Sequence, residues 1–275
     1  MVEPTARIRP FKAEDEKLAK FTIGKANMEG LTTANTKSER IQRCLGISDL
    51  IVGQPGCTLW TISIWVALSC IWIQYMQWWP DAYHGYVSYL RPVPAFACLA
   101  VPILALVDWI NRPYFEKVLQ TVLRKPDMHD LAGYYGSTPA SGFWLLEYGD
   151  SFVGLIAIDA SVDTDSNPGA RKKKSQPVSS TAVITHFSVD EKYQSTNVQD
   201  DLLAHAVRHA FTSSSTVQRV EGIDSPLVTF TRPCYNTAGF KTASVLEPIG
   251  VFKWRPSKRV LERSEWEKRE TTTSR

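Results

Sequence analysis

His186 is the first residue whose type and position could do chemistry. It lies in the segment TAVITHFSV, whose apolar and β-branched residues predict a β-strand. Side chains alternate between the two faces of a strand, so we expect His186 on the same face as Ile184 and Ser188. An imidazole on that face could line a cleft and accept a proton near neutral pH. A structural role for a lone histidine on a strand is the alternative interpretation.

Other chemically capable residue types do not form a pattern. Glu147 and Asp159 lie near expected strand ends without a partner that would distinguish them. The cysteines have no metal-ligand spacing, so the sequence predicts neither a metal site nor a disulfide framework; they are Cys44, Cys57, Cys70, Cys98 and Cys234. The formal net charge of +3 is too small to indicate a nucleic-acid partner.

The elements around these candidates predict an α/β (α+β) fold with one mixed sheet flanked by helices. Gly149 and Asp150 join two strands in a predicted hairpin. The expected order is a strand at 6–11, a helix at 13–30, a helix from Pro113 to Pro126, strands at 142–160 and 181–189, a helix at 198–211, a strand at 217–223, a helix at 226–238 ending at Gly239, and strands across 240–254.

A long uncharged stretch interrupts this order. Residues 57–79 contain no Asp, Glu, Lys or Arg and exceed the roughly 20 residues that a membrane helix needs. A second apolar segment at 93–110 is interrupted by prolines. Lys and Arg are frequent before the first segment and after the second, whereas the connector carries only Arg91. The positive-inside rule therefore predicts a two-helix membrane hairpin with both flanks in the cytosol.

These observations divide the chain into four parts. Residues 1–50 supply the first strand and helix, residues 51–112 the membrane hairpin, and residues 113–255 the remainder of the same domain. Residues 256–275 are predicted to be a charged tail with little to bury.

The segments THFSVDEKYQSTNVQDDLLAHAVRHAF and PCYNTAGFK resemble the GNAT superfamily of N-acetyltransferases. The expected order of strands and helices resembles that fold as well. With the predicted hairpin between its first two helices, the chain is most similar to the membrane-bound camello-like and cysteine-S-conjugate N-acetyltransferases. The resemblance implies acetyl-CoA as the co-substrate and an amine as the acetyl acceptor.

The resemblance also implies a set of site residues. The strand end at Val189 and the loop that opens the next helix would hold acetyl-CoA, and the loop residues are Gln194, Asn197, Val198 and Gln199. Asn197 and Gln199 stand where the family has small residues that let the backbone approach a pyrophosphate. Asp200 and Asp201 follow in the first helical turn, where they favour the helix dipole and oppose a bound anion.

Acetyl transfer needs a base for the amine and an acid for the leaving thiolate. By resemblance, Tyr235 in YNTAGF is the acid and His186 the base; Tyr235 could equally be a packed tyrosine at a helix end. Two functions follow. One is a membrane-anchored N-acetyltransferase at the endoplasmic reticulum, acting on an amine on the cytosolic side. The other is a catalytically inactive GNAT-like packaging chaperone or adaptor for membrane-protein clients.

Overall fold

The computed structural model describes residues 6–37, 58–79, 93–149, 151–162, 177–250 and 253–273. The chain separates into two compact units. The sheet unit comprises Met1–Glu29, Glu116–Ile249 and Lys253–Arg275, and the helical unit comprises Gly30–Phe115 and Gly250–Phe252.

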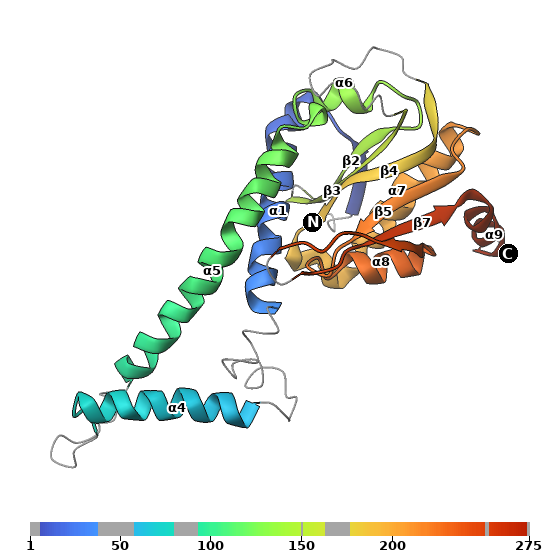
Figure 1. Ribbon diagram of the computed structural model, residues 1–275. Helices are drawn as coiled ribbons and strands as arrows, with labels where there is room; N and C mark the ends of the chain where they lie inside the picture. Colours follow the sequence, from blue (N-terminus) through green and yellow to red (C-terminus); the bar gives the residue numbers. More distant parts are fainter. Residues whose placement is uncertain are drawn as a thin grey trace. The chain divides into compact units, whose positions relative to one another are not determined.

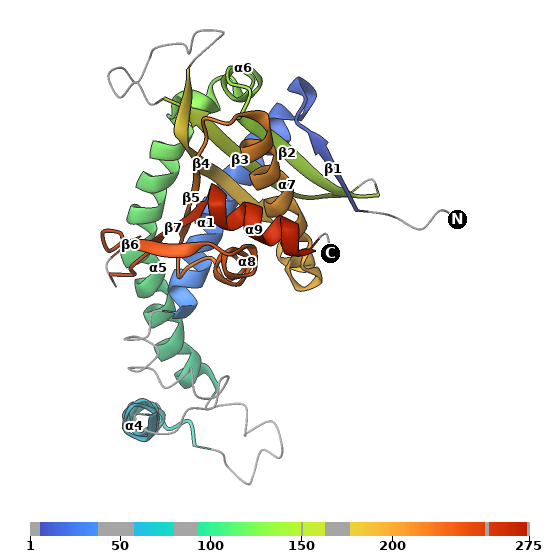
Figure 2. The same cartoon turned by 90° about the vertical axis from the view of Figure 1, so that its right-hand side faces the viewer.

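The sheet unit is built on a seven-stranded mixed sheet with the order β1-β2-β3-β4-β5-β7-β6. Figure 1 shows its central strands, and Figure 2 labels all of them. All neighbours pair antiparallel except β4 and β5, which run parallel. The expected mixed sheet is therefore confirmed. The strands are β1 (Ala6–Pro10), β2 (Gly142–Tyr148), β3 (Ser151–Ser161), β4 (Val178–Val189), β5 (Arg219–Asp224), β6 (Lys241–Val245) and β7 (Ser257–Glu262).

Helices cover both faces of this sheet (Figure 2). Helix α7 (Val198–Ser213) buries its apolar stripe against one face, where α8 (Thr231–Ala238) and α9 (Arg263–Thr273) also pack. The stripe predicted on α7 is the buried one, and its members are Leu202, Leu203, Ala206, Val207 and Ala210. The other face is covered by α6 (Leu131–Tyr135) and the first part of α1 (Glu16–Lys37). The short 3₁₀ helices are η1 (Ala13–Asp15), η3 (Pro126–Met128) and η4 (Glu191–Thr196).

Two glycines act at the turns where they were expected. Tyr148 pairs with Ser151, so the β2–β3 hairpin turns between these two residues, as expected. Asp150 lies outside the described residues. Gly149 has a φ of 59°, which glycine adopts at no steric cost. Gly239 follows α8 with a φ of 88° and ends that helix.

The segment 256–275, expected to be a charged tail, instead contains β7 and α9. Strand β7 pairs with both β5 and β6. Its charges find buried partners: Arg259 donates to Asp224, a residue with no exposed surface, at 2.8 Å. Trp266 of α9 packs on Phe211 with the ring centroids 5.1 Å apart.

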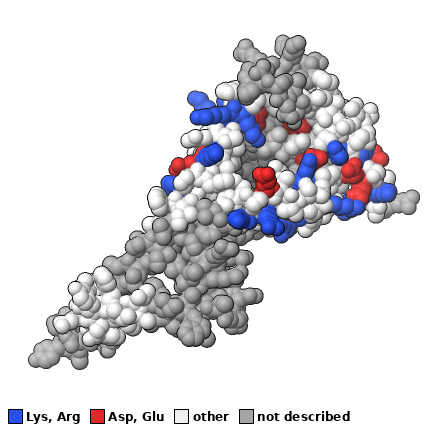
Figure 3. Space-filling model, viewed as in Figure 1, with Lys and Arg blue, Asp and Glu red and all other residues white. Residues whose placement is uncertain are grey.

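On the face seen in Figure 3, Lys and Arg are interspersed with Asp and Glu over the described part of the sheet unit.

The helical unit contains α4 (Thr58–Tyr75), the end of α1 and most of α5 (Val93–Leu123). Asn35 donates to Asp108 at 2.9 Å and accepts from Asn111 at 2.8 Å, which joins α1 to α5 within this unit. The predicted segment 93–110 and residues 113–123 of the predicted segment 113–126 lie in this single helix. A proline in a helix interior removes one hydrogen bond and can kink the helix without ending it.

No helix among the described residues combines the length and the apolar character that crossing a membrane requires. The predicted membrane hairpin over 57–79 and 93–110 is therefore not supported. Its connector, residues 80–92, lies outside the described residues, as do residues 38–57 of the predicted first and second parts.

Candidate active site

A β-bulge at Thr185 sets the orientation of the candidate base. His186 pairs with Ala157 of β3 and Ile184 pairs with Ile158, so Thr185 is an extra residue on β4. The extra residue reverses the alternation of side chains. Ile184 belongs to the apolar cluster on the α7 face, whereas His186 lies on the α6 face. The expectation that His186 and Ile184 share a face is therefore wrong.

His186 is part of a buried hydrogen-bond network on the α6 face. Its Nε2 lies 2.7 Å from Oδ2 of Asp127, which belongs to η3. The same carboxylate oxygen accepts a hydrogen bond of 3.0 Å from the hydroxyl of Tyr135. That hydroxyl also lies 2.7 Å from Oγ1 of Thr185, the bulge residue. The His186 and Asp127 side chains are only 6% and 5% exposed, so the network is shielded from solvent.

The network keeps Asp127 ionised. Burial alone would raise its pKa, but the hydrogen bond and charge of His186, together with the Tyr135 hydroxyl, lower the pKa below its usual value. Burial and the neighbouring Asp127 charge raise the pKa of Tyr135 well above its usual value, so this phenol stays neutral. An ionised Asp127 favours the proton of a neutral imidazole on Nε2, which leaves Nδ1 as the acceptor.

Strands β4 and β5 diverge beside His186. They pair at only three positions, from Thr181 with Arg219 to Val183 with Glu221. Beyond these pairs, residues 184–189 of β4 and 222–224 of β5 do not pair with each other. We call this divergence the seam. The backbone groups of β4 that face the seam could bond the amide groups of an extended ligand.

Tyr235 reaches the seam from the opposite face. Its side chain is 1% exposed and packs against Phe240 and Phe187, with ring centroids 4.9 and 6.3 Å away. A Cβ built on Gly222, the first β5 residue beyond the ladder, would lie 2.6 Å from the Tyr235 hydroxyl. Burial raises the pKa of Tyr235. Its hydroxyl is therefore protonated at neutral pH, and among the described residues it has no hydrogen-bond partner.

The two sequence-predicted catalytic residues therefore flank the same stretch of β4. Phe187 contacts Tyr235 on the α8 face, while the neighbouring His186 contacts Asp127 on the α6 face. A group held in the seam between them would have a protonated phenol on one side and an imidazole on the other.

The loop before α7 adopts the backbone that its sequence allowed. Asn197 has a φ of 59°, so it occupies the left-handed region, which asparagine tolerates better than most residues. Gln194 donates from Nε2 to the Val189 carbonyl at 2.9 Å. Gln199 is 5% exposed and donates from Nε2 to the Gln194 carbonyl at 3.0 Å. Val198 packs against the apolar cluster beneath. Three of the cofactor-binding candidates, Val189, Gln194 and Gln199, are thus hydrogen-bonded to one another.

Acceptor groups dominate at the start of α7. Oε1 of Gln199 and Oδ1 of Asp200 are buried without a hydrogen-bond partner among the described residues. Burial, followed by the hydrogen bond and charge of Asp200, raises the pKa of the Cys234 thiol. Unpartnered oxygens and a carboxylate repel an anion, so this loop does not fit a pyrophosphate in its present arrangement.

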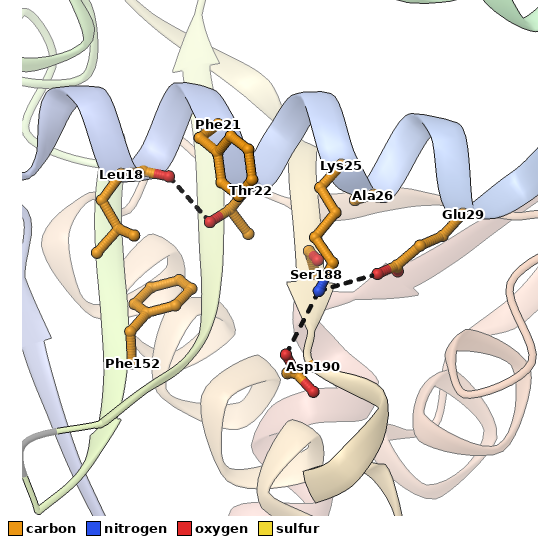
Figure 4. A pocket seen from close by; sticks show the side chains of 9 residues that line it. All are labelled: Leu18, Phe21, Thr22, Lys25, Ala26, Glu29, Phe152, Ser188 and Asp190. Atoms are coloured by element: carbon orange, nitrogen blue, oxygen red, sulfur yellow. Dashed lines mark hydrogen bonds and ion pairs between the residues drawn. The ribbon is translucent and has the colours of Figure 1, made fainter.

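A pocket of about 140 Å³ lies beside the same strand, between α1 and the ends of β3 and β4 (Figure 4). Ser188 and Asp190 contribute from the end of β4, two and four residues beyond His186. The remaining lining residues are Leu18, Phe21, Thr22, Lys25, Ala26, Glu29 and Phe152.

Sequence reasoning missed Asp127 and this pocket. Asp127 lies in the segment KPDMHD, where no spacing relates it to His186. The pocket brings α1 next to a strand end more than 150 positions away, as the Lys25–Asp190 separation of 165 indicates. Within the described ranges, no group of His, Cys, Asp or Glu is arranged to hold a metal ion.

The fold is a seven-stranded mixed sheet flanked by helices, and the three strands β2 to β4, helix α7, β5 and α8 follow one another in the order expected from the sequence. Neither a protein-family model nor a curated protein sequence matches the chain. A GNAT-family acetyltransferase from Streptococcus pneumoniae superposes with a TM-score of 0.40 and 13% identity, over 49% of this chain and 74% of that one.

Two further solved structures are similar to the same extent. The ribosomal-protein-S18-alanine N-acetyltransferase from Escherichia coli has a TM-score of 0.36 and 14% identity, over 49% of this chain and 76% of that chain. Mutant forms of the spermidine/spermine N-acetyltransferase SpeG from Vibrio cholerae have a TM-score of 0.37 and 12% identity, over 57% and 78%. Because these scores and identities are low, the function must be argued from the site itself.

Proposed function

We propose that this chain is an N-acetyltransferase that moves an acetyl group from acetyl-CoA to an amine. The observation that carries the proposal is the seam, with the His186–Asp127 pair on one side of β4 and Tyr235 on the other. This arrangement supplies the acceptor of the amine proton and a donor for the leaving sulfur next to a backbone edge that can hold the thioester arm.

In the proposed reaction, the nitrogen of a neutral amine attacks the carbonyl carbon of the thioester. The C–N bond forms, the C–S bond breaks, and the amine proton passes to Nδ1 of His186 and then to solvent. Asp127 holds the imidazole in the tautomer that accepts at Nδ1. The products are an acetamide and a free thiol.

Tyr235 has a narrower role than full proton donation. The pKa of an ordinary phenol already exceeds that of a thiol, and burial raises the pKa of Tyr235 further. Transfer of its proton to sulfur is therefore unfavourable. The hydroxyl is suited to donate a hydrogen bond to the departing thiolate, which then takes its proton from water.

The two ends of acetyl-CoA fit this chain unequally. The unpaired edge of β4 suits the amide-bearing arm that leads to the thioester. At the other end, the buried Gln199 side chain and the Asp200 carboxylate oppose the pyrophosphate. An active enzyme can therefore bind acetyl-CoA in two ways. Either the Gln199 side chain rotates away from the pyrophosphate, or most of the binding affinity comes from the amide-bearing arm of acetyl-CoA.

The same loop favours a second function, a catalytically inactive GNAT-like adaptor for membrane-protein clients. Its support is that the side-chain amide of Gln194 donates to the Val189 carbonyl and that of Gln199 donates to the Gln194 carbonyl, so both donors are used within the loop. In that case His186 and Asp127 would be a structural pair.

Calorimetry of the full chain with acetyl-CoA separates the two functions. Binding together with acetyl transfer to an amine supports the enzyme, and absence of both supports the adaptor. The variant Gln199→Ala makes the test more specific, because it removes the buried side-chain amide from the loop before α7. For the enzyme we expect this variant to bind acetyl-CoA about tenfold more tightly, whereas Gln218→Ala, an exposed site outside the loop, should leave affinity unchanged.

Attachment to the endoplasmic reticulum with both ends in the cytosol is a further proposal, and its only support is the uncharged stretch and the charge bias of its flanks. Carbonate extraction of microsomes, with tags at both ends tested for protease access, decides it. A chain released by carbonate, or ends on opposite sides, would exclude the proposed topology.

A further inference from the structure

The pocket between α1 and β4 contains a cation held between two carboxylates. Lys25 Nζ lies 3.4 Å from Oε1 of Glu29 and 3.5 Å from Oδ2 of Asp190 (Figure 4). Both distances are at the long end for ion pairs, and the Lys25 side chain is 50% exposed. Such an exposed pair contributes little to stability, so the lysine can leave the carboxylates at small cost.

Beside these three charged residues, the pocket wall contains the large apolar side chains of Leu18, Phe21 and Phe152. Phe21 and Leu18 remain 69% and 40% exposed on α1, and Phe152 faces them from β3 (Figure 4). Large apolar side chains that stay exposed around a pocket favour a ligand that covers them.

Ser188 contributes a polar group at the base of the pocket. The residue is 8% exposed, and no described residue is hydrogen-bonded to its hydroxyl. A hydroxyl that lines a pocket and has no protein partner can form a hydrogen bond with a donor or acceptor of a ligand. Ser188 follows His186 by two residues on the same strand, a separation of about 7 Å along β4.

We propose that this pocket binds the acceptor, and that the acceptor is a primary amine on an apolar chain or ring, without a carboxylate near its nitrogen. This inference rests on the proposed acetyl transfer. The ammonium group of the acceptor replaces that of Lys25 at Glu29 and Asp190, and its apolar part covers Leu18, Phe21 and Phe152. The bound ammonium group loses one proton to solvent before its nitrogen attacks as a neutral amine. The two carboxylates exclude α-amino acids by repelling their carboxylate group.

Binding measurements without acetyl-CoA test the pocket independently of turnover. Hexylamine, which is cationic at pH 7, is titrated into the full chain by calorimetry, with hexan-1-ol and norleucine as matched ligands. We expect hexylamine to bind at least about tenfold more tightly than either, because only it combines the charge with an apolar chain and lacks a carboxylate.

Substitutions locate the binding. Asp190→Asn and Glu29→Gln should each weaken hexylamine binding about fivefold, and Lys25→Met should strengthen it about fivefold by removing the competing ammonium. The matched control is Lys20→Met, which breaks the ion pair with Glu16 on the same helix outside the pocket. It should leave the affinity unchanged.

The outcomes separate this inference from the proposed reaction. Equal affinity for hexylamine and hexan-1-ol would contradict amine binding in this pocket, even if acetyl transfer is found. A hexylamine affinity that does not change in Lys25→Met and Asp190→Asn would contradict it as well. Binding that follows the expected pattern supports the pocket even if acetyl-CoA does not bind, in which case the proposed transfer is the part that fails.

Discussion

Asp127 and His186 are brought together by a bulge and a 3₁₀ turn although they are 59 positions apart. The pair is buried, and Tyr135 adds a second hydrogen bond to the same carboxylate oxygen. A buried, fully ionised acceptor restricts the ring to one orientation. A fixed ring orientation is useful for a catalytic base, and the same hydrogen bond can stabilise the fold. Measurements on variants separate these two roles.

Asp127→Asn should weaken the fold in a pH-dependent way. At pH 7 we expect a loss of about 1–3 kcal/mol in the free energy of unfolding, because His186 and Tyr135 lose a charged partner. The folded-state pKa of Asp127 lies below the unfolded value of about 4. The Asp127 contribution is therefore complete above about pH 4 and lost as pH falls through the lower folded pKa.

Melting curves of both proteins from pH 7 to pH 3 check this prediction. The two melting temperatures should converge toward the acid end. A constant difference over the whole range would show that Asp127 is not the titrating group. If His186 is the base, the variant should also shift the acid limb of kcat/KM, which a purely structural pair would not do.

Tyr235→Phe tests the seam from its other side. The ring keeps its packing and only an unpartnered hydroxyl is lost, so the melting temperature should be unchanged or slightly higher. Loss of a hydrogen bond to a developing thiolate should lower kcat about 10- to 100-fold with little change in acetyl-CoA affinity. A turnover number equal to that of the wild type would remove Tyr235 from the mechanism.

At the residue scale, the sequence predicted the backbone conformations that depend only on neighbouring residues. Asn197 has the positive φ that its type tolerates, and Gly149 and Gly239 stand at turns. The partner of His186 could not be predicted, because Asp127 approaches it through tertiary packing. The bulge at Thr185 leaves no signature in a sequence of alternating residues, and it inverted the predicted face of His186 relative to Ile184.

At the scale of elements, β5 and α8 pack so closely that no side chain larger than that of glycine fits at Gly222 without a shift of Tyr235. A Cβ on Gly222 would lie 2.6 and 2.8 Å from Oη and Cζ of Tyr235. The Tyr235 ring is held by Phe240 and Phe187 and cannot withdraw freely. The distance between β5 and α8 therefore depends on a glycine at this one strand position.

Gly222→Ala should destabilise the chain by about 1–3 kcal/mol, since the methyl group must displace a buried ring. Gly24→Ala is the matched control. Its Cβ would meet only Leu119 Cδ1 at 3.8 Å, and alanine in a helix interior is favoured over glycine by up to about 1 kcal/mol. Denaturant titrations should give opposite signs for the two variants, and equal signs would contradict this packing.

Element types were predictable where one periodicity persisted. The buried stripe of α7 and the β2–β3 hairpin follow from their patterns. The helix α5 was predicted as two pieces because its prolines were interpreted as breaks. The helix η3, which carries Asp127, is too short for any periodicity to indicate.

At the scale of the whole molecule, the charged C-terminal segment supports the sheet. Asp224, on β5, has no exposed surface and is bonded by Arg259 of β7 and Arg232 of α8. Composition predicted a solvated tail because residues 256–275 are rich in charge. Composition could not predict that Arg259 in this segment bonds a buried carboxylate, Asp224, on β5.

A chain that ends at Arg255 should therefore fail to fold. It lacks β7, which lies between β5 and β6, and it leaves Asp224 buried without Arg259. Removing one partner of a buried pair typically costs about 3–5 kcal/mol, and the missing strand adds to this. A chain that ends at Thr273 is the control. Circular dichroism and limited proteolysis should distinguish them, and cooperative melting of the shorter chain would contradict the prediction.

The pairing of β1 with β2 has a consequence for how the protein is made. Arg9 on β1 bonds Glu147 on β2 across 138 positions. At about 5–20 residues per second, a ribosome needs about 7–28 s to produce the second strand after the first. During that time β1 has no sheet to join, and β7 is not completed until residue 262. The sheet therefore closes late in synthesis, and a ribosome-bound chain stalled before residue 142 should leave its first strand open to proteases and chaperones.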